Sequence, residues 1–459
     1  MNNSRGSEHG SGLLRTHLAF GFVLVGLWSV VLESMAVTVA LPAIALDFAI
    51  PSARATWVMG MSQFIIVALL LPMASLGEAI GIRRLYLAAL LIFSIATVAC
   101  IIAPSFEALV VARAFQAAGT AGVMSVNFAL ARALYSNKHL GTAIGAMATS
   151  VAIATSGGPA LSGVLLELGG WRWIFALMLT FSVIGYVGGA VLLPPNKTSG
   201  RQFDAKDAVL VALTFSCILY VLNGLANGWT MWSIAVAAFA SVAGFVLLAR
   251  VSRGKVGAVF PLDLLELPVF NLSVFAAIFA FAAQSLAFIL LPFYLILGVG
   301  LSPIEMALVL SVWPFSTALL APILGWMSDR IPAGPVGAVG LIIFAFGFIL
   351  LATMPQHTSA IGIALRLVTC GVGFAAFQTP NNRLVMLSAP RDRSGAASGV
   401  ISVARQFGRA IGTAIAAIIL TASPDMATPT AMNFAAGLAL LGAVAAVVRA
   451  VAIRDRTPV

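Results

Sequence analysis

The stretch LAFGFVLVGLWSVVLESMAVTVALPAIALDF, residues 18–48, decides how the rest of the chain must be built. It carries only two charged side chains, Glu33 and Asp47. A membrane-spanning helix needs about 20 mostly apolar residues. The stretch is therefore long enough to cross a bilayer, and it is far longer than the apolar core of a signal peptide. We predict that it is the first of a series of membrane spans.

The composition of all 459 residues agrees with this interpretation. Hydrophobic residues make up 61% and charged residues only 9%, whereas soluble proteins carry about 25% charged residues. This excludes a soluble protein, and the hydrophobic content excludes a disordered one. The net charge of +10 does not indicate a nucleic-acid partner, because the basic residues are scattered between apolar runs. The three cysteines, Cys100, Cys217 and Cys370, lie within apolar runs. We therefore predict neither disulfides nor metal sites.

Charges and proline or glycine clusters divide the remaining chain into further apolar runs. We predict fourteen helical spans, at 18–42, 55–76, 85–103, 107–134, 139–166, 171–193, 207–226, 229–250, 270–297, 303–327, 335–353, 358–387, 394–421 and 429–451. With both termini in the cytoplasm, nearly all loop Lys and Arg residues fall inside, and only Arg54 and Arg172 fall outside. This is the split that the positive-inside rule requires, and it also favours contact with anionic inner-leaflet lipid.

An internal repeat divides the chain into two similar halves. Glu78 matches Asp329 after the second and tenth spans, and Arg113 matches Arg366 in the fourth and twelfth, at offsets of 251 and 253 residues. Glycines of the fifth span recur in the thirteenth, 254 residues later: Gly141, Gly145 and Gly158 match Gly395, Gly399 and Gly412. Repeats of this kind are typical of secondary transporters. The predicted units are a cytoplasmic tail (1–16), a six-helix bundle (17–194), a loop with two extra spans and a linker (195–269), a second six-helix bundle (270–452) and a cytoplasmic tail (453–459).

Several short motifs accompany the repeat. They are Glu33 followed by TVALP up to Pro42, RAFQAAG from Arg113, GPALSG at 158–163, WRWIF at 171–175, PLDLLELPVF at 261–270, TPNN at 379–382, SGAASG at 394–399 and RQFG at 405–408. Together they resemble the fourteen-helix drug:proton antiporter branch of the major facilitator superfamily. The resemblance implies two helical bundles that alternate access to a midplane cavity. The chain departs from the family pattern at Glu33 and Glu78, where Asp is usual, and at Ala79, Ser162 and Met178.

The resemblance also assigns roles to residues. It places proton coupling at Glu33 and Arg113, and an antiporter motif at Gly158, Pro159 and Gly163. The matched positions of Glu78 and Asp329 in the repeat predict gating by charged groups at the cytoplasmic ends of the halves: Glu78, Arg83, Arg84, Asp329 and Arg330. Neutralising Glu78 or Asp329 should slow transport and leave substrate binding largely intact.

Glu33 is the one carboxylate that we expect deep within a span, where a charge costs about 2.5–3.5 kcal/mol. If Pro42 marks the outer edge, Glu33 lies roughly 13 Å deep at 1.5 Å per residue, and Arg113 lies roughly 9–10 Å deep beyond Glu107. The two side chains can therefore pair. A purely structural ion pair, or an Arg113 that caps backbone carbonyls, remains an alternative.

We expect residues of both halves to line the central cavity and to contact the substrate. These are Trp57, Met61, Gln63, Phe64, Asn127, Gln284, Trp313, Arg366, Phe377, Arg405 and Arg409. Gln284 stands where the repeat predicts a partner of Glu33, and because it is uncharged, proton handling is expected in the N-terminal half. Four intramembrane cations, Arg113, Arg366, Arg405 and Arg409, against one acid argue mildly against a pump dedicated to organic cations.

Together the residues and the resemblance favour a multi-pass protein of a bacterial-type inner membrane that exports hydrophobic or amphipathic compounds against protons. Its partners would be a small-molecule substrate, protons and the lipid bilayer, with no nucleic acid, and we expect a monomer. Two alternatives remain: a proton-coupled exporter of an anionic or zwitterionic metabolite, and a non-transporting membrane scaffold or receptor. No phosphate-binding loop or HExxH motif is present, so we predict no enzyme, cofactor or metal.

Overall fold

The computed structural model describes residues 4–135, 137–195, 203–226, 229–253, 259–355, 358–390, 394–422 and 427–454. Every regular element in these ranges is helical. The elements are α1 (Ser4–Asp47), α2 (Ser52–Ala55), α3 (Trp57–Ile80), α4 (Ile82–Ile101), α5 (Phe106–Leu134), α6 (Asn137–Gly169), α7 (Trp171–Leu192), α8 (Ala205–Ala226), α9 (Met231–Ser252), α10 (Leu262–Leu265), α11 (Pro268–Phe293), the π-helical turn η1 (Tyr294–Gly298), α12 (Pro303–Arg330), α13 (Ala333–Ala352), α14 (Ala360–Ser388), α15 (Ser394–Ala422) and α16 (Ala427–Arg454). Fourteen helices in the described ranges are long and apolar enough to cross a membrane, so the predicted number of spans is confirmed.

Local sequence signals explain where the helices begin and turn. The side chains of Ser105, Ser302 and Ser359 accept hydrogen bonds from the first turns of α5, α12 and α14, as helix N-caps do. Gly81 and Gly170 adopt positive φ angles of 100° and 77° at the tight turns that follow α3 and α6. Only glycine adopts such angles without strain, so these two residues let consecutive spans reverse direction.

The first helix is longer than expected. It does not end near Pro42 but continues to Asp47. A proline inside a helix of a membrane bundle is tolerated because neighbouring helices compensate for the lost hydrogen bond. Glu33 therefore lies fourteen residues before the end of α1, and Pro42 lies within the helix rather than at its end.

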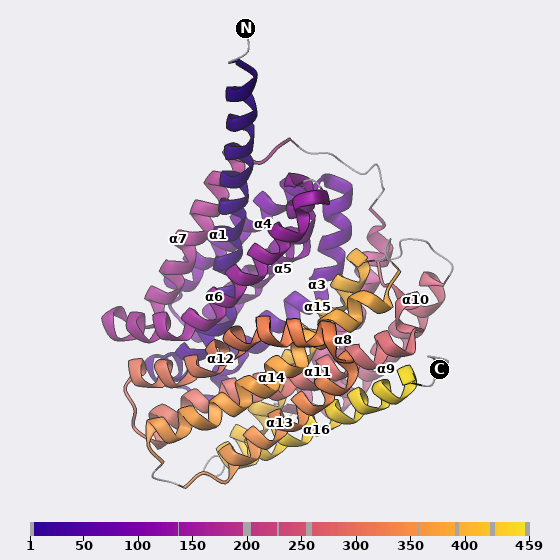
Figure 1. Ribbon diagram of the computed structural model, residues 1–459. Coiled ribbons are helices and arrows are strands. Elements are labelled where there is room, and N and C mark those ends of the chain that lie inside the picture. The colour runs from indigo at the N-terminus through magenta and orange to yellow at the C-terminus, as the bar shows by residue number, and fades with distance from the viewer. Residues whose placement is uncertain are drawn as a thin grey trace.

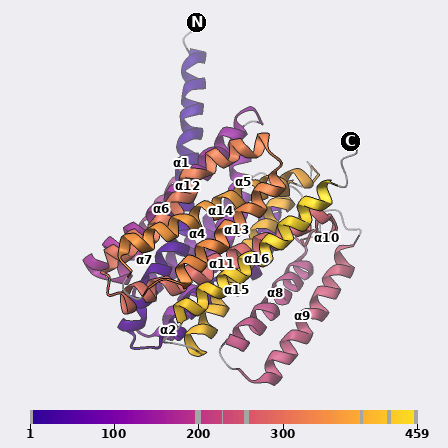
Figure 2. The ribbon, with the colours of Figure 1, turned by 60° about the horizontal axis from the view of Figure 1, so that its bottom comes forward.

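The spans form two bundles of six and one separate pair. Figure 1 shows the N-terminal bundle (α1 and α3 to α7, indigo to magenta) beside the C-terminal bundle (α11 to α16, orange to yellow). Figure 2 shows α8 and α9 as a pair at one side of the molecule. α8 packs against both α3 and α15, so it covers a lateral seam between the bundles.

The other seam is closed by α6 and α12, which lie side by side in Figure 1. A Cβ atom on Gly163 of α6 would lie 2.4 Å from Cβ of Ala307 and 2.8 Å from the carbonyl oxygen of Pro303. The backbone N–H of Ile304 donates to the Glu167 carboxylate at 3.3 Å. The bundles therefore touch at the ends of α6 and α12 that bear Gly163 and Ala307.

The positive-inside pattern predicts which loops between the spans face the cytoplasm. Single cysteines in 197–206 and 391–393 should react only with reagents in the cytoplasm, and cysteines at 356 and 425 only with external reagents. Most of these positions lie outside the described residues. Labelling in intact cells and in inverted vesicles measures the sidedness, and external labelling of 197–206 would contradict the predicted orientation.

Candidate functional site

The predicted pair of buried charges forms in the N-terminal bundle. Nη2 of Arg113 in α5 lies 2.7 Å from Oε1 of Glu33 in α1, and the two residues are only 0% and 2% exposed. Thr120, also in α5, donates to Oε2 of Glu33 at 2.7 Å. Both carboxylate oxygens therefore have a partner away from water, which a buried charge requires.

A hydrogen-bonded chain extends from Arg113 into α4. Its Nη1 donates to Oε1 of Gln116, and Nε2 of Gln116 donates to Thr97 of α4 at 2.8 Å. The Nε atom of Arg113 donates to the Val58 carbonyl of α3 at 3.4 Å, and its guanidinium lies 5.8 Å from the Phe175 ring centroid. Arg113 thus contacts three neighbouring helices directly and reaches α4 through Gln116, and it combines the two contacts foreseen for it, an ion pair and a bond to a backbone carbonyl.

Glycines place α5 close enough to α4 for this chain to form. A Cβ on Gly119 would lie 2.7 Å from the Ala89 carbonyl oxygen, and a Cβ on Gly122 would lie 2.6 Å from Cβ of Ala89. Gly119 ends the RAFQAAG motif that begins at Arg113. The motif therefore combines the charged side chain with the close helix contact on which its hydrogen bonds depend.

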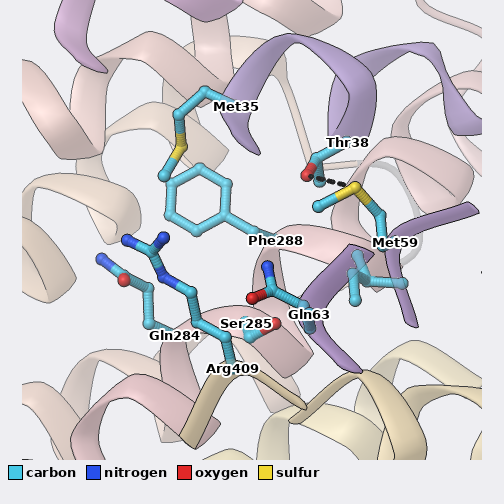
Figure 3. A pocket seen from close by; sticks show the side chains of 9 residues that line it. Met35, Thr38, Met59, Gln63, Gln284, Ser285, Phe288 and Arg409 are labelled. Atoms are coloured by element: carbon cyan, nitrogen blue, oxygen red, sulfur yellow. Dashed lines mark hydrogen bonds between the residues drawn. The ribbon is translucent and has the colours of Figure 1, made fainter. Parts of the chain in front are cut away.

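A small pocket lies where the two bundles meet, next to this pair. Residues of the N-terminal bundle (Met35, Thr38, Met59 and Gln63) and of the C-terminal bundle (Gln284, Ser285, Phe288, Ile289 and Arg409) line it. Figure 3 shows the polar ends of Arg409 and Gln284 beside one another. The volume is about 20 Å³, enough for about one water molecule. A larger substrate therefore requires the bundles to separate.

The pocket is amphipathic. Met35, Met59, Phe288 and Ile289 supply apolar surface, and the buried Oε1 atom of Gln63 has no hydrogen-bond partner among the described residues. A buried polar atom without a partner is unfavourable. A ligand or a water molecule that donates a hydrogen bond to Gln63 would remove that penalty.

Two arginines of α15 line this interface from the C-terminal bundle. Nη2 of Arg405 donates to Oδ1 of Asn382 at 2.6 Å, and Nη1 of Arg409 donates to Oε1 of Gln406 at 3.2 Å. Both guanidiniums lie near the Phe281 ring, at 5.6 and 5.4 Å from its centroid. Met35, two residues after Glu33 in α1, lines the same pocket as Arg409, so a change in the charge of Glu33 acts across the interface on Arg409.

The remaining cavity candidates lie elsewhere. Trp57, Met61 and Phe64 line a second, peripheral pocket between α3 and α8. Trp313 packs among Phe288, Phe344 and Phe348. Buried residues also include Asn127 and Phe377, and within the part of the chain that the structure describes, Oδ1 of Asn127 has no hydrogen-bond partner. Arg366 bonds to the backbone carbonyls of Leu350 and Gly362.

The gating candidates lie at the ends of matched helices. Glu78 is in the last turn of α3, and Asp329 and Arg330 end α12. Arg83, at the start of α4, donates to the Ala190 carbonyl of α7 at 2.6 Å, and Arg84 follows it in the same turn. The side chain of Asp329 lies outside the described part of the structure.

One buried cation, Arg449, is missing from the four intramembrane cations that the sequence predicts. Arg449 is fully buried in α16, and its Nη1 donates to Ser273 of α11 and to Asn381 of α14 at 2.8 and 2.5 Å. Both asparagines of the TPNN motif thus accept a hydrogen bond from an arginine: Asn381 from Arg449, and Asn382 from Arg405. Only the neighbouring apolar residues on both sides of Arg449 signal that it lies within the bundle.

A buried ion pair in one of two similar helical bundles, beside a pocket between them, defines a membrane transport protein. The sequence profile of the Major Facilitator Superfamily matches residues 23–413 and 273–458. The chain belongs to this superfamily.

Comparison with individual proteins agrees with this assignment. The chain is 35% identical to the uncharacterized transporter YebQ of Escherichia coli, over 95% of both chains. It is 28% identical to the multidrug resistance protein Stp of Mycobacterium tuberculosis, over 87% of this chain and 74% of Stp. A crystal structure of a peptide transporter, POT, in complex with sulfate has the same fold, with a TM-score of 0.73, 17% identity and coverage of 95% and 94%. The fourteen apolar helices and the bacterial relatives indicate a multi-pass protein of the inner membrane.

Proposed function

We propose that this transporter exports hydrophobic or amphipathic compounds in exchange for protons, by alternating access. The observation that carries the proposal is the buried pair of Glu33 and Arg113, 2.7 Å apart, beside a pocket that both bundles line. An ionisable group inside a membrane bundle is a functional hypothesis by default, because burying it is costly. The similarity to Stp, a multidrug resistance protein, supports a drug-like substrate.

A proton on Glu33 would act as the switch. Protonation neutralises the carboxylate and weakens its ion pair with Arg113, while the bonds of Arg113 to Gln116 and to the Val58 carbonyl can persist. The relative stability of two arrangements of α1 and α5 would thereby change, as a two-state transport cycle requires. Glu78, Arg83, Arg84, Asp329 and Arg330 would gate the cytoplasmic ends, and Gly158, Pro159 and Gly163 would let α6 pack and bend at the seam.

The interaction between Glu33 and Arg409 predicts which substrates can exchange with protons. Protonation of Glu33 removes negative charge facing Arg409, so the pocket becomes more positive as the pH falls. A cation should then bind less tightly at low pH and compete with the proton, as exchange requires. An anion should bind more tightly at low pH and would travel with the proton.

The second candidate, transport of an anionic or zwitterionic metabolite, rests on Arg405 and Arg409. In the described residues neither has a carboxylate partner. An anion in the pocket would compensate the charge of Arg409, which lines it. By the argument above, such a substrate would leave together with a proton, so export would have to be driven by the outward gradient of the metabolite itself.

Substrate-coupled proton movement in proteoliposomes tests both candidates and the scaffold alternative. An internal pH-sensitive dye reports flux on addition of ethidium (a cation), N-phenylnaphthylamine (neutral) or a naphthalenesulfonate (an anion). We expect proton exchange with ethidium or the neutral compound, and weaker ethidium binding at lower pH. Proton cotransport with the sulfonate alone would support the second candidate, and no flux with any compound in a broad screen would exclude transport.

A further inference from the structure

The extra helix pair forms a second pocket that lies apart from the interface between the bundles. Trp57, Gly60, Met61 and Phe64 of α3 form one wall, and Tyr220 of α8 and Trp229, just after α8, form the other. The Trp57 and Trp229 rings stack with centroids 5.6 Å apart and planes at 27°, and the Trp229 and Tyr220 centroids lie 4.5 Å apart. None of these six residues carries a charge, so the pocket has aromatic and apolar walls.

The sequence at the end of α8 holds Trp229 in place. Its backbone N–H donates to the Gly224 carbonyl at 3.0 Å. A Cβ on Gly224 would lie 3.1 Å from Cε3 of Trp229 and 2.9 Å from Cγ1 of Ile234. The glycine therefore leaves room for the indole to turn toward α3. This arrangement differs from that of Trp232 in α9, which is 79% exposed.

The two pockets lie on different faces of one helix. Met59 and Gln63 of α3 line the pocket between the bundles, whereas Gly60, Met61 and Phe64 line the peripheral one. α3 therefore contributes to the walls of both pockets. α8, which forms the outer wall, also packs against α15 through Phe215 and Phe407, with ring centroids 6.3 Å apart. The peripheral pocket thus lies beside the lateral seam between the bundles.

We propose that this α3–α8 pocket is a lateral binding site for a planar aromatic group of the transported compound, reached from the bilayer. Its volume is about 120 Å³, close to that of cavities that bind one benzene ring. Flat indole and phenol rings interact best with another ring, by offset or edge-to-face contact, whereas a flexible acyl chain gains little from such geometry. The inference rests on the proposed function, because it assumes that the transported compounds are hydrophobic.

Photolabelling of the reconstituted full-length protein with 1-azidonaphthalene, without a proton gradient, tests the site. We expect labelling of Trp57, Met61, Phe64 or Trp229 that excess N-phenylnaphthylamine suppresses. Trp229→Ala removes one aromatic wall and Met61→Trp fills the space, so each should reduce this displaceable labelling about tenfold. Trp232→Ala, in the same helix pair but facing outward, should leave it unchanged.

Three results would overturn the proposal. The first is labelling that the competitor does not suppress. The second is equal labelling in the two pocket variants and the wild type. The third is strong labelling of the pocket by phosphatidylcholine that carries a photoreactive acyl chain, if the competitor fails to displace it. The last result would make a lipid chain the occupant. Because labelling needs neither transport nor protons, displaceable labelling without flux would refute only the proposed function, and flux without it would refute only this site.

Discussion

Glu33→Gln is expected to abolish gradient-driven export, which makes it one of the two largest effects that the structure predicts. The carboxamide keeps the shape of the side chain and can still accept the hydrogen bond of Thr120, but it cannot release a proton. Substrate-coupled proton flux in proteoliposomes should fall to that of protein-free vesicles. Exchange of substrate without a gradient should survive, because it requires no proton. Proton flux equal to that of the wild type would refute the role of Glu33.

A stability measurement separates this role from a purely structural ion pair. Removing one partner of a buried pair leaves an uncompensated charge and costs about 3–5 kcal/mol, so Glu33→Gln should also lower the melting temperature in detergent. Glu33→Gln combined with Arg113→Gln removes both charges and should recover most of that stability without recovering proton coupling. Glu33→Asp, one methylene shorter, should keep part of the activity. Coupling restored in the double variant would show that the pair serves only packing.

Gly163→Ala should cause the second large effect, because a single methyl group obstructs the seam. Its Cβ would lie 2.4 Å from Cβ of Ala307 and 2.8 Å from the Pro303 carbonyl oxygen. Overpacking of this kind costs about 1–3 kcal/mol. That free energy lowers the equilibrium population of the state in which α6 and α12 touch about fivefold to more than a hundredfold, relative to the state in which they are apart. The transport rate should fall accordingly, and a cysteine at 307 should react faster with a thiol reagent in the Gly163→Ala variant.

Gly157→Ala is the matched control in the same helix. A Cβ at Gly157 meets no atom within 4 Å, while the gain in helix propensity from Gly to Ala is the same at both positions. It should leave transport unchanged. Ala307→Gly in the Gly163→Ala background removes the closest clash and should restore part of the rate. Similar rates for the Gly163→Ala and Gly157→Ala variants would mean that the seam does not limit transport.

The sequence was sufficient to predict the number of membrane spans and the contact between Glu33 and Arg113. The number of spans follows from hydropathy because every span must supply its own backbone hydrogen bonds in lipid. The contact was predicted although α1 extends beyond Pro42, because only one acid was expected deep within a span. Scarcity of charge made the partner of Arg113 identifiable.

Which face of a helix a residue occupies was harder to predict. Trp57, Met61 and Phe64 recur at helical spacing and share one face of α3, whereas Gln63 belongs to another. This periodicity can be recognised in the sequence, but nothing in the sequence shows that α8 covers the face that bears Trp57, Met61 and Phe64. The bonds of Arg366 to backbone carbonyls were equally hidden, because they depend on how α13 ends beside α14.

The burial of Arg449 has a consequence for how the protein is made. Its guanidinium bonds to Ser273 and Asn381, which belong to helices synthesised earlier. While the chain is still on the ribosome, Asn381 therefore lacks this partner, and the arginine meets it only when the last span has left the translocon. Assembly of the C-terminal bundle must wait for that step. A ribosome that stalls before residue 449 would leave an incomplete bundle exposed to membrane quality-control proteases.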